Sequence, residues 1–432
     1  MLERQLHVRV ECYSAATPQA EERDGYGPGT ANARAGLRSQ DTRLGELMVA
    51  LKTQGLDATT NVVVVSDHGH SSVSGPLGLY PLRGIVPGAA PSGPLINGAT
   101  SGTSGAVPGV PNPGCFSFSG DVCTADLLTY RGFKAYDGNS CTISAMYGPT
   151  AIGTPTVPVK ADTAGTRCGT AGAKYQAVSS LLATPVANFK VPAPGTLPAN
   201  AVVVAANGGL DYLYVPSHDA ATIQTLVTFL QSREEYGAVF VDSRYGAIPG
   251  TFAMKDANLE SSARQNNGQP DIVVTFNRDE TTSIQGKNGI EFESTGGQRG
   301  MHGSFGITDV HNTLIGFGPS FQKGIVVSNP TGNVDVAPTV AYLLGLSLPG
   351  ANGRILDEAL AKPSQTATPS VASRVMMPSA ISGLAFETPT DPTGASKDIG
   401  KTGSYTVRLA VKDLTVGGKT YRYFDYARVV RR

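Results

Sequence analysis

The chain has 432 residues, of which 40% are hydrophobic and 16% charged, and its 34 basic residues balance its 34 acidic ones. This length is enough for one large domain with a small one, or for two to three ordinary domains. The zero net charge argues against a protein held to nucleic acid or to a membrane surface by bulk electrostatics. With 52 glycines and 29 prolines, the composition predicts a loop-rich globular protein and excludes a disordered or coiled-coil one.

The first predicted elements are a helix and a strand. Residues 31–52 repeat leucines such as Leu37 and Leu44 at helical spacing, and Gly55 is placed to end the helix. The four consecutive valines of 62–65 predict a strand buried on both faces of a parallel sheet. A helix followed by a short buried strand is typical of an α/β fold.

Residues 71–200 interrupt this pattern and read as a large insertion rich in Gly, Pro, Ser, Thr and Ala. Four cysteines fall in it and predict two disulfides, hence a secreted or periplasmic protein; the alternative is four unpaired thiols in a cytosolic loop. Residues 1–10 lack the apolar core of a signal peptide, and no stretch is apolar enough for a membrane span. The cysteines of the insertion are Cys115, Cys123, Cys141 and Cys168.

The α/β pattern resumes after the insertion. A strand at 201–205 is followed by a helix at 220–232, for which Asp219 is the predicted N-cap. Another helix opens at 335–339, where Pro338 is tolerated in the first turn. Further strands are predicted at 238–241, 271–276 and 313–317.

The C-terminal part changes composition. Residues 361–374 are rich in Pro, Ser, Thr and Ala, which predicts a linker. Beyond it, the alternating segment 405–411, the pair Gly417-Gly418 and the strand-like segment 419–430 predict a hairpin. We therefore expect a small β appendage at 375–432.

The strongest local motif is Ser66-Asp67-His68-Gly69, which follows the valine strand. Ligands bind at the carboxyl ends of strands in open α/β sheets, and a carboxylate beside an imidazole there forms a pair of zinc ligands. The alternative is an Asp N-cap beside a surface histidine. His70 follows the pair and could line the cleft, although a surface position is favoured.

A second motif, Arg299-Gly300-Met301-His302-Gly303-Ser304, places a histidine between glycines on a loop. Alone, His302 would be a turn histidine more often than a ligand. Metal sites, however, are assembled from distant segments, and hydrolytic two-metal sites use mixed Asp and His ligands. The two motifs together therefore favour a metal site.

These motifs carry a resemblance to a known family. The stretches GYGPGTANARAGLRSQDTRLGELMVALK, TTNVVVVSDHGH, GLDYLYVP, QRGMHGSFGITDVHNTLIGFGPSF and VDVAPTVAYLLGLSLPG occur in order over residues 24–360. Here the sequence resembles the type I phosphodiesterase/nucleotide pyrophosphatase family of the alkaline phosphatase superfamily. The resemblance implies an alkaline-phosphatase-like fold with a mixed, mostly parallel sheet flanked by helices, and leaves 1–23 as an unmatched N-terminal segment.

The resemblance also implies a hydrolase with two Zn²⁺ ions. A Thr or Ser nucleophile attacks phosphorus in line and forms a covalent phospho-enzyme. By motif match, Asp67 and His68 would bind the zinc that activates the nucleophile, and His302 would bind the other zinc. The implied substrate is a small-molecule phosphate ester or a nucleotide.

The chain departs from the family pattern in its first residues. Counting back from Gly27-Pro28, the family's histidine falls on Asp24 and its aspartate on Ala20, so Asp24 is only a possible substitute ligand. The nucleophile segment is expected upstream of the Asp67 motif, and no residue there resembles it. Three of six expected zinc ligands remain, which predicts an N-terminally truncated or frameshifted sequence with weak zinc binding and little turnover.

Two other functions compete with this interpretation. His302-Gly303-Ser304-Phe305-Gly306 comes close to G-x-S-x-G, so Ser304 could be the nucleophile of a serine hydrolase. That motif should follow a strand and open a helix, whereas the residues on both sides of it read as loop. The second alternative is a non-catalytic remnant that serves as a binding module.

Overall fold

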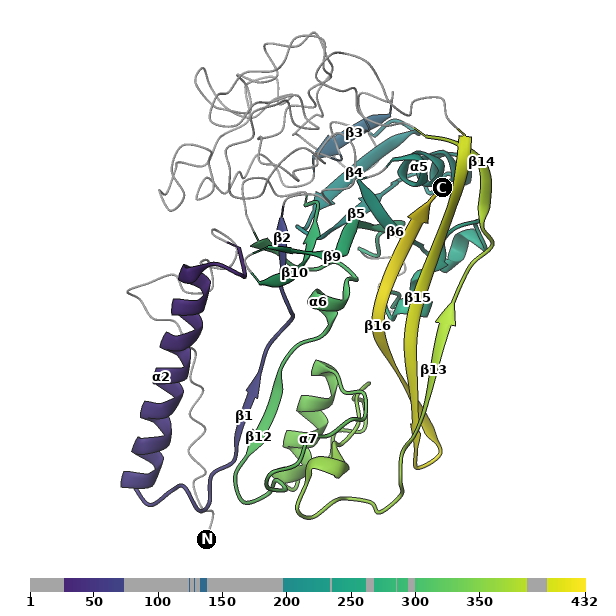
Figure 1. The fold of residues 1–432 in the computed structure, drawn as a ribbon. Helices are drawn as coiled ribbons and strands as arrows, with labels where there is room; N and C mark the ends of the chain where they lie inside the picture. The colour runs from purple at the N-terminus through teal and green to yellow at the C-terminus, as the bar shows by residue number, and fades with distance from the viewer. Residues whose placement is uncertain are drawn as a thin grey trace.

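A computed structural model shows a mixed α/β protein with several sheets and few helices (Figure 1). Among the residues that it describes, no helix has both the length and the hydropathy needed to span a bilayer. The structure describes residues 27–73, 124, 128, 133–137, 197–233, 235–261, 268–284, 286–293, 300–386 and 402–432.

The α-helices are α2 (Ala31–Thr53), α5 (Ala220–Ser232), α6 (Ile307–Val310) and α7 (Val336–Leu343). The strands are β1 (Val62–Val65), β2 (Ser71–Val73), β3 (Lys134–Asp137), β4 (Ala201–Ala206), β5 (Leu210–Tyr214), β6 (Tyr236–Val241), β7 (Phe252–Ala253), β8 (Ile272–Phe276), β9 (Arg278–Ile284), β10 (Lys287–Glu291), β11 (Gly300–Met301), β12 (Leu314–Phe317), β13 (Ser370–Met376), β14 (Ile381–Ala385), β15 (Thr402–Val416) and β16 (Lys419–Arg431).

Helix α2 forms where the sequence predicts it. The Thr30 hydroxyl caps its first turn by accepting from the Ala33 N–H at 3.2 Å. The chain leaves the helix at Gly55, whose φ of 64° lies in the left-handed region. Of the helix residues, only Ala33 and Gly36 are buried in the described structure, and Leu37 is 57% exposed. Leu44, Leu47, Met48 and Leu51 are half-buried, so the apolar face of α2 is only partly covered.

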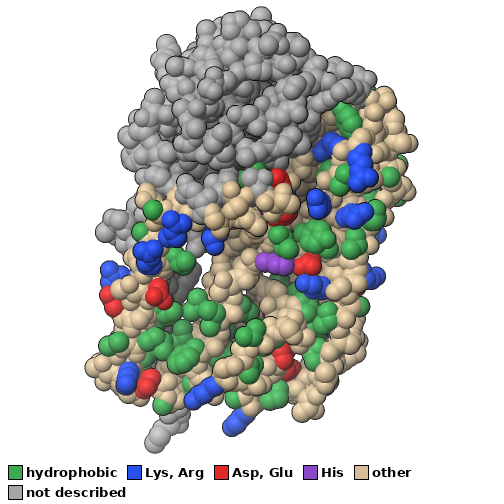
Figure 2. All heavy atoms as spheres, in the orientation of Figure 1, with side chains coloured by type: hydrophobic (Ala, Val, Ile, Leu, Met, Phe, Trp, Pro, Cys, Tyr) green, Lys and Arg blue, Asp and Glu red, His purple; other side chains and the backbone are tan. Residues whose placement is uncertain are grey.

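Strand β1 differs from its predicted environment. It pairs antiparallel with β12, Val62 opposite Phe317, in a two-stranded sheet, and Val65 is 43% exposed. The prediction of a strand was right and that of burial on both faces was wrong, because a valine run does not specify which layers cover it. Hydrophobic side chains gather over this region and α7 in Figure 2. This exposed surface favours aggregation.

The main core lies between α5 and a six-stranded sheet of order β3-β4-β5-β8-β6-β7. Helix α5 begins at Ala220, and the predicted N-cap Asp219 accepts from the Thr222 N–H at 2.7 Å. Ile223 and Leu226 of the helix pack against Leu213 in the sheet. The predicted helix 220–232 is confirmed, and the predicted strands 201–205, 238–241, 271–276 and 313–317 correspond to β4, β6, β8 and β12.

The strand directions differ from the expected mostly parallel sheet. Of the pairings between described strands, three are parallel and nine are antiparallel. A connection as short as residues 207–209, between β4 and β5, can join only antiparallel neighbours. The expectation rested on the resemblance and on buried valine runs, and neither specifies strand direction.

The predicted C-terminal hairpin is confirmed as β15 and β16, joined by Gly417 and Gly418 at φ 58° and 76°. It is not a separate appendage, because Tyr405 and Leu409 of β15 share a buried core with Phe240 of β6. Strand β13 pairs with β15 and begins at Ser370, inside the predicted linker.

The hairpin and the six-stranded sheet are joined by a buried hydrogen bond, which predicts a stability effect. The Tyr405 hydroxyl donates to the Gly237 carbonyl at 3.0 Å. Tyr405→Phe removes this donor and should lower the free energy of unfolding by about 1 kcal/mol. Urea denaturation followed by circular dichroism measures the change. Tyr342→Phe is the control, because its hydroxyl bonds Lys362 O at an exposed position, and we expect less than about 0.5 kcal/mol.

Candidate functional site

Asp67 and His68 lie in the turn that follows β1. The Asp67 side chain is 85% exposed, and its Oδ2 lies 3.4 Å from His68 Nε2. His68 Nδ1 lies 2.7 Å from the Gly69 carbonyl oxygen, which can only accept a hydrogen bond. Nδ1 therefore carries the proton in neutral His68, and the Nε2 lone pair is available to a ligand.

His302 reaches this turn through the pairing of β11 with β2, which places Met301 opposite Ser71. The His302 and His68 rings are stacked, with centroids 3.6 Å apart and planes at 16°. His70 is the third member, with its ring centroid 5.4 Å from that of His302. The structure thus brings together Asp67, His68 and His302, as the motifs suggested.

The sequence interpretation gave His70 little weight. It favoured a surface position over one in the cleft, whereas this side chain is partly buried and lies beside both other imidazoles. The available signal was the position of His70, two residues after His68 and directly before β2.

The geometry allows a test of whether these residues suit a zinc ion. Tetrahedral zinc with N and O ligands at about 2.0–2.2 Å keeps neighbouring ligand atoms about 3.3 Å apart. The 3.4 Å between Asp67 Oδ2 and His68 Nε2 fits this spacing. Within the described ranges, however, no three or more His, Cys, Asp or Glu side chains are arranged to hold one metal ion. Asp67 and His68 are therefore spaced as two ligands of one zinc ion, and the described residues supply no third ligand to it.

Other predicted site residues cannot be placed. Asp24 lies outside the described residues, as do the cysteines of the insertion, Cys115, Cys123, Cys141 and Cys168.

Two asparagines hold the turn that carries Asp67 and were not found from the sequence. Asn333 Nδ2 donates to the Asp67 carbonyl at 2.8 Å and to the Ser66 carbonyl at 3.1 Å. Asn312 Nδ2 donates to the same Ser66 carbonyl at 2.7 Å. These bonds fix the main chain on which the carboxylate and imidazole are mounted, although both asparagines are distant in sequence.

The surroundings of Ser304 do not support a serine hydrolase. Ser304 is only 6% exposed, and its Oγ donates to Asp309 Oδ2 at 2.6 Å. The same oxygen accepts from Arg278 Nη1 at 2.6 Å and from the Gly306 N–H at 3.2 Å. A nucleophile needs a base and access to substrate, whereas this hydroxyl proton is held by a buried carboxylate. The flanking residues are a short strand, β11, and the single turn α6, not loop on both sides as expected.

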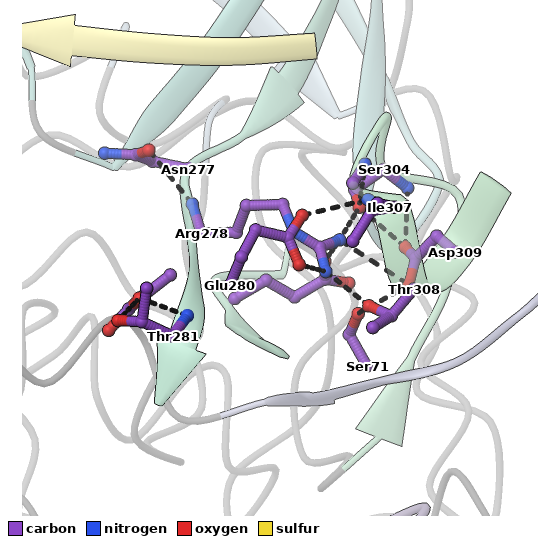
Figure 3. Close-up of polar contacts among 12 residues, drawn as sticks. Ser71, Asn277, Arg278, Glu280, Thr281, Ser304, Ile307, Thr308 and Asp309 are labelled. Carbon is purple, nitrogen blue, oxygen red and sulfur yellow. Dashed lines mark hydrogen bonds and ion pairs between the residues drawn. The ribbon is translucent and has the colours of Figure 1, made fainter. Parts of the chain in front are cut away.

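A buried charged network centred on Arg278 contacts Ser71 and Ser304, which follow His70 and His302 in the chain (Figure 3). Its guanidinium lies 3.1 Å from Glu291 Oε2, 2.8 Å from Glu280 Oε1 and 3.6 Å from Asp309 Oδ1. Burial raises the pKa of Glu291 well above its usual range, and the negative charge of Asp309 raises it further. Sequence reasoning did not find this network, because its members come from separate strands and a one-turn helix.

Comparison with known families supports the motif reading. Residues 21–97 match the family model described as Type I phosphodiesterase / nucleotide pyrophosphatase, which is the family suspected from the motifs. This segment contains Asp67 and His68 and ends before His302. No curated protein matches the chain.

The raised pKa of Glu291 predicts a pH dependence of stability. The unfolded side chain releases its proton near pH 4.5, and the folded one holds it to higher pH. Between those values the folded state binds more protons, so stability should fall as pH rises. Glu291→Gln is neutral at every pH and should flatten this slope. Thermal unfolding of both proteins from pH 4.5 to 8 measures it, and parallel profiles would contradict the assignment.

Proposed function

We propose that this protein is a metal-dependent hydrolase of small-molecule phosphate esters or nucleotides, of the phosphodiesterase/nucleotide pyrophosphatase type. The observation that carries the proposal is the pairing of Asp67 and His68 at zinc-ligand spacing, with His302 stacked on His68. The family match over residues 21–97 supports the reaction class, phosphate-ester hydrolysis.

In this proposal Asp67 and His68 hold one zinc ion and His302 contributes to a second. Bound zinc supplies positive charge that stabilises phosphate oxygens and activates a nucleophile. In neutral His68 the bond from Nδ1 to the Gly69 carbonyl leaves the lone pair on Nε2 and orients the ring. The exposed Asp67 carboxylate is accessible to an ion from solvent.

The remaining elements of the proposal concern residues outside the described ranges. Asp24 is proposed as a substitute oxygen ligand. Disulfides among Cys115, Cys123, Cys141 and Cys168 would accompany a secreted or periplasmic location. In-line attack through a covalent phospho-enzyme needs a Thr or Ser nucleophile, and we assign none among the described residues. We therefore propose impaired turnover.

Zinc titration tests the ligand set. By isothermal titration calorimetry of the metal-free protein with ZnCl₂, Asp67→Asn and His68→Gln should each weaken binding by at least about 10-fold, since even the loss of an outer-shell partner has this effect. His218→Gln is the control, because its imidazole bonds Asp271 beside the six-stranded sheet. Equal affinity in the wild type and both ligand variants would contradict the proposed site.

Turnover is tested separately with bis(p-nitrophenyl) phosphate in the presence of Zn²⁺. We expect hydrolysis near the uncatalysed background, because only part of the ligand set is assigned and no nucleophile is. Zinc binding without turnover would also suit a non-catalytic binding module. Occupancy by two zinc ions with rapid hydrolysis, measured alongside metal analysis, would show that the proposed impairment is wrong.

A further inference from the structure

One carboxylate connects the two histidine loops. Asp309 Oδ1 accepts from the Ser71 hydroxyl at 2.5 Å, and Oδ2 accepts from the Ser304 hydroxyl at 2.6 Å and from the Ser304 N–H at 3.1 Å. Ser71 is the neighbour of His70, and Ser304 lies two residues after His302. Asp309 therefore bonds the segments that carry both imidazoles.

The main chain of α6 makes a further contact with the first loop. The Gly69 N–H donates to the Asp309 carbonyl at 2.7 Å. A Cβ at position 69 would lie 1.7 Å from the Thr308 carbonyl oxygen, so only glycine permits this approach. The backbone next to His68 is thus in direct contact with the backbone of α6, the helix that carries Asp309.

Arg278 lies 3.6 Å from Asp309 Oδ1 and bonds the residues around it. Its Nη1 donates to Ser304 Oγ, and its Nη2 donates to Glu280 Oε2 at 3.1 Å and also to the Thr308 hydroxyl. Thr308 Oγ1 in turn lies 2.9 Å from Ser71 Oγ. Figure 3 shows these side chains converging from separate segments on one small volume. Each of the two serines therefore has a second partner in the network.

Joining two loops through buried charges costs free energy, because each charged group loses its hydration. Apolar side chains of similar volume often stabilise a fold as well or better, whereas a hydrogen-bonded network admits one arrangement of its partners. Here the network contacts both histidine segments. Its physical effect is to define their separation and rotation.

We propose that Asp309 is a positioning residue that sets the stacked arrangement of His68 and His302. The consequence for metal affinity rests on the proposed function, whereas the consequence for ring geometry does not. The two can therefore be measured independently.

The experiment uses Asp309→Asn, which keeps one acceptor oxygen and removes the charge. The matched control is Asp271→Asn, because Asp271 is also buried and accepts from a backbone N–H, that of Val215, and from a hydroxyl, that of Tyr245. Both substitutions should lower thermal stability, and only Asp309→Asn should change the site.

The first readout is the NMR spectrum of histidine-labelled protein without metal. The chain has six histidines, and His68→Gln and His302→Gln assign the stacked pair. Stacked rings shift each other's C–H resonances upfield. Asp309→Asn should abolish this shift and Asp271→Asn should retain it. If the upfield shift persists in Asp309→Asn, the positioning role is overturned, whatever the metal result.

The second readout is Zn²⁺ affinity by calorimetry. We expect Asp309→Asn to weaken binding by about 10- to 100-fold, as for other outer-shell partners of metal ligands, and Asp271→Asn to leave it unchanged. If the wild type binds no zinc, the proposed function fails and the NMR result still decides the positioning role. If Asp309→Asn does not fold, Ser304→Ala replaces it. It removes the hydroxyl bond to Asp309 and keeps those from Ser71 and the Ser304 N–H, so the upfield shift should decrease, and an unchanged shift would overturn the positioning role.

Discussion

The arrangement of the site depends on one contact, between the turn after β1 and the segment from β11 to α6. Asp309 accepts hydrogen bonds from both, and Gly69 allows their backbones to meet. Because Asp309 is buried, it needs an opposite charge, which Arg278 supplies. Burial in the same place raises the pKa of Glu291, and the nearby carboxylate of Asp309 raises it further. The same contact between these two segments thus brings the histidines together and contains the buried network.

The sequence was informative where a local pattern determines the structure. Helix α5 begins after its predicted cap Asp219, the hairpin turns at Gly417-Gly418, and the Asp67-His68 pair follows strand β1. These features depend on neighbouring residues alone. His302 was singled out because glycines on both sides of it mark a loop, and its ring stacks on that of His68.

What the sequence could not predict depends on contacts between distant segments. The exposure of Val65 is decided by which elements cover β1, and the strand directions by connections that a valine run does not encode. Arg278 and Asp309 are 31 positions apart, and although Asp309 lies in one of the quoted stretches, Arg278 lies in none, so only the fold shows that they meet. The C-terminal hairpin looked like an appendage because its alternation does not reveal that Tyr405 packs on the six-stranded sheet.

The pairing of β1 with β12 has a consequence for synthesis. Asn61, just before β1, bonds Ser320, just after β12, and the two are 259 positions apart. At a translation rate of about 5–20 residues per second, β12 is synthesised on the order of 13–50 s after the valine strand β1. During that time a short, strongly apolar segment is present on the ribosome without its native neighbour. Chaperone binding to nascent chains should therefore concentrate on this segment, well before the site that it supports can assemble.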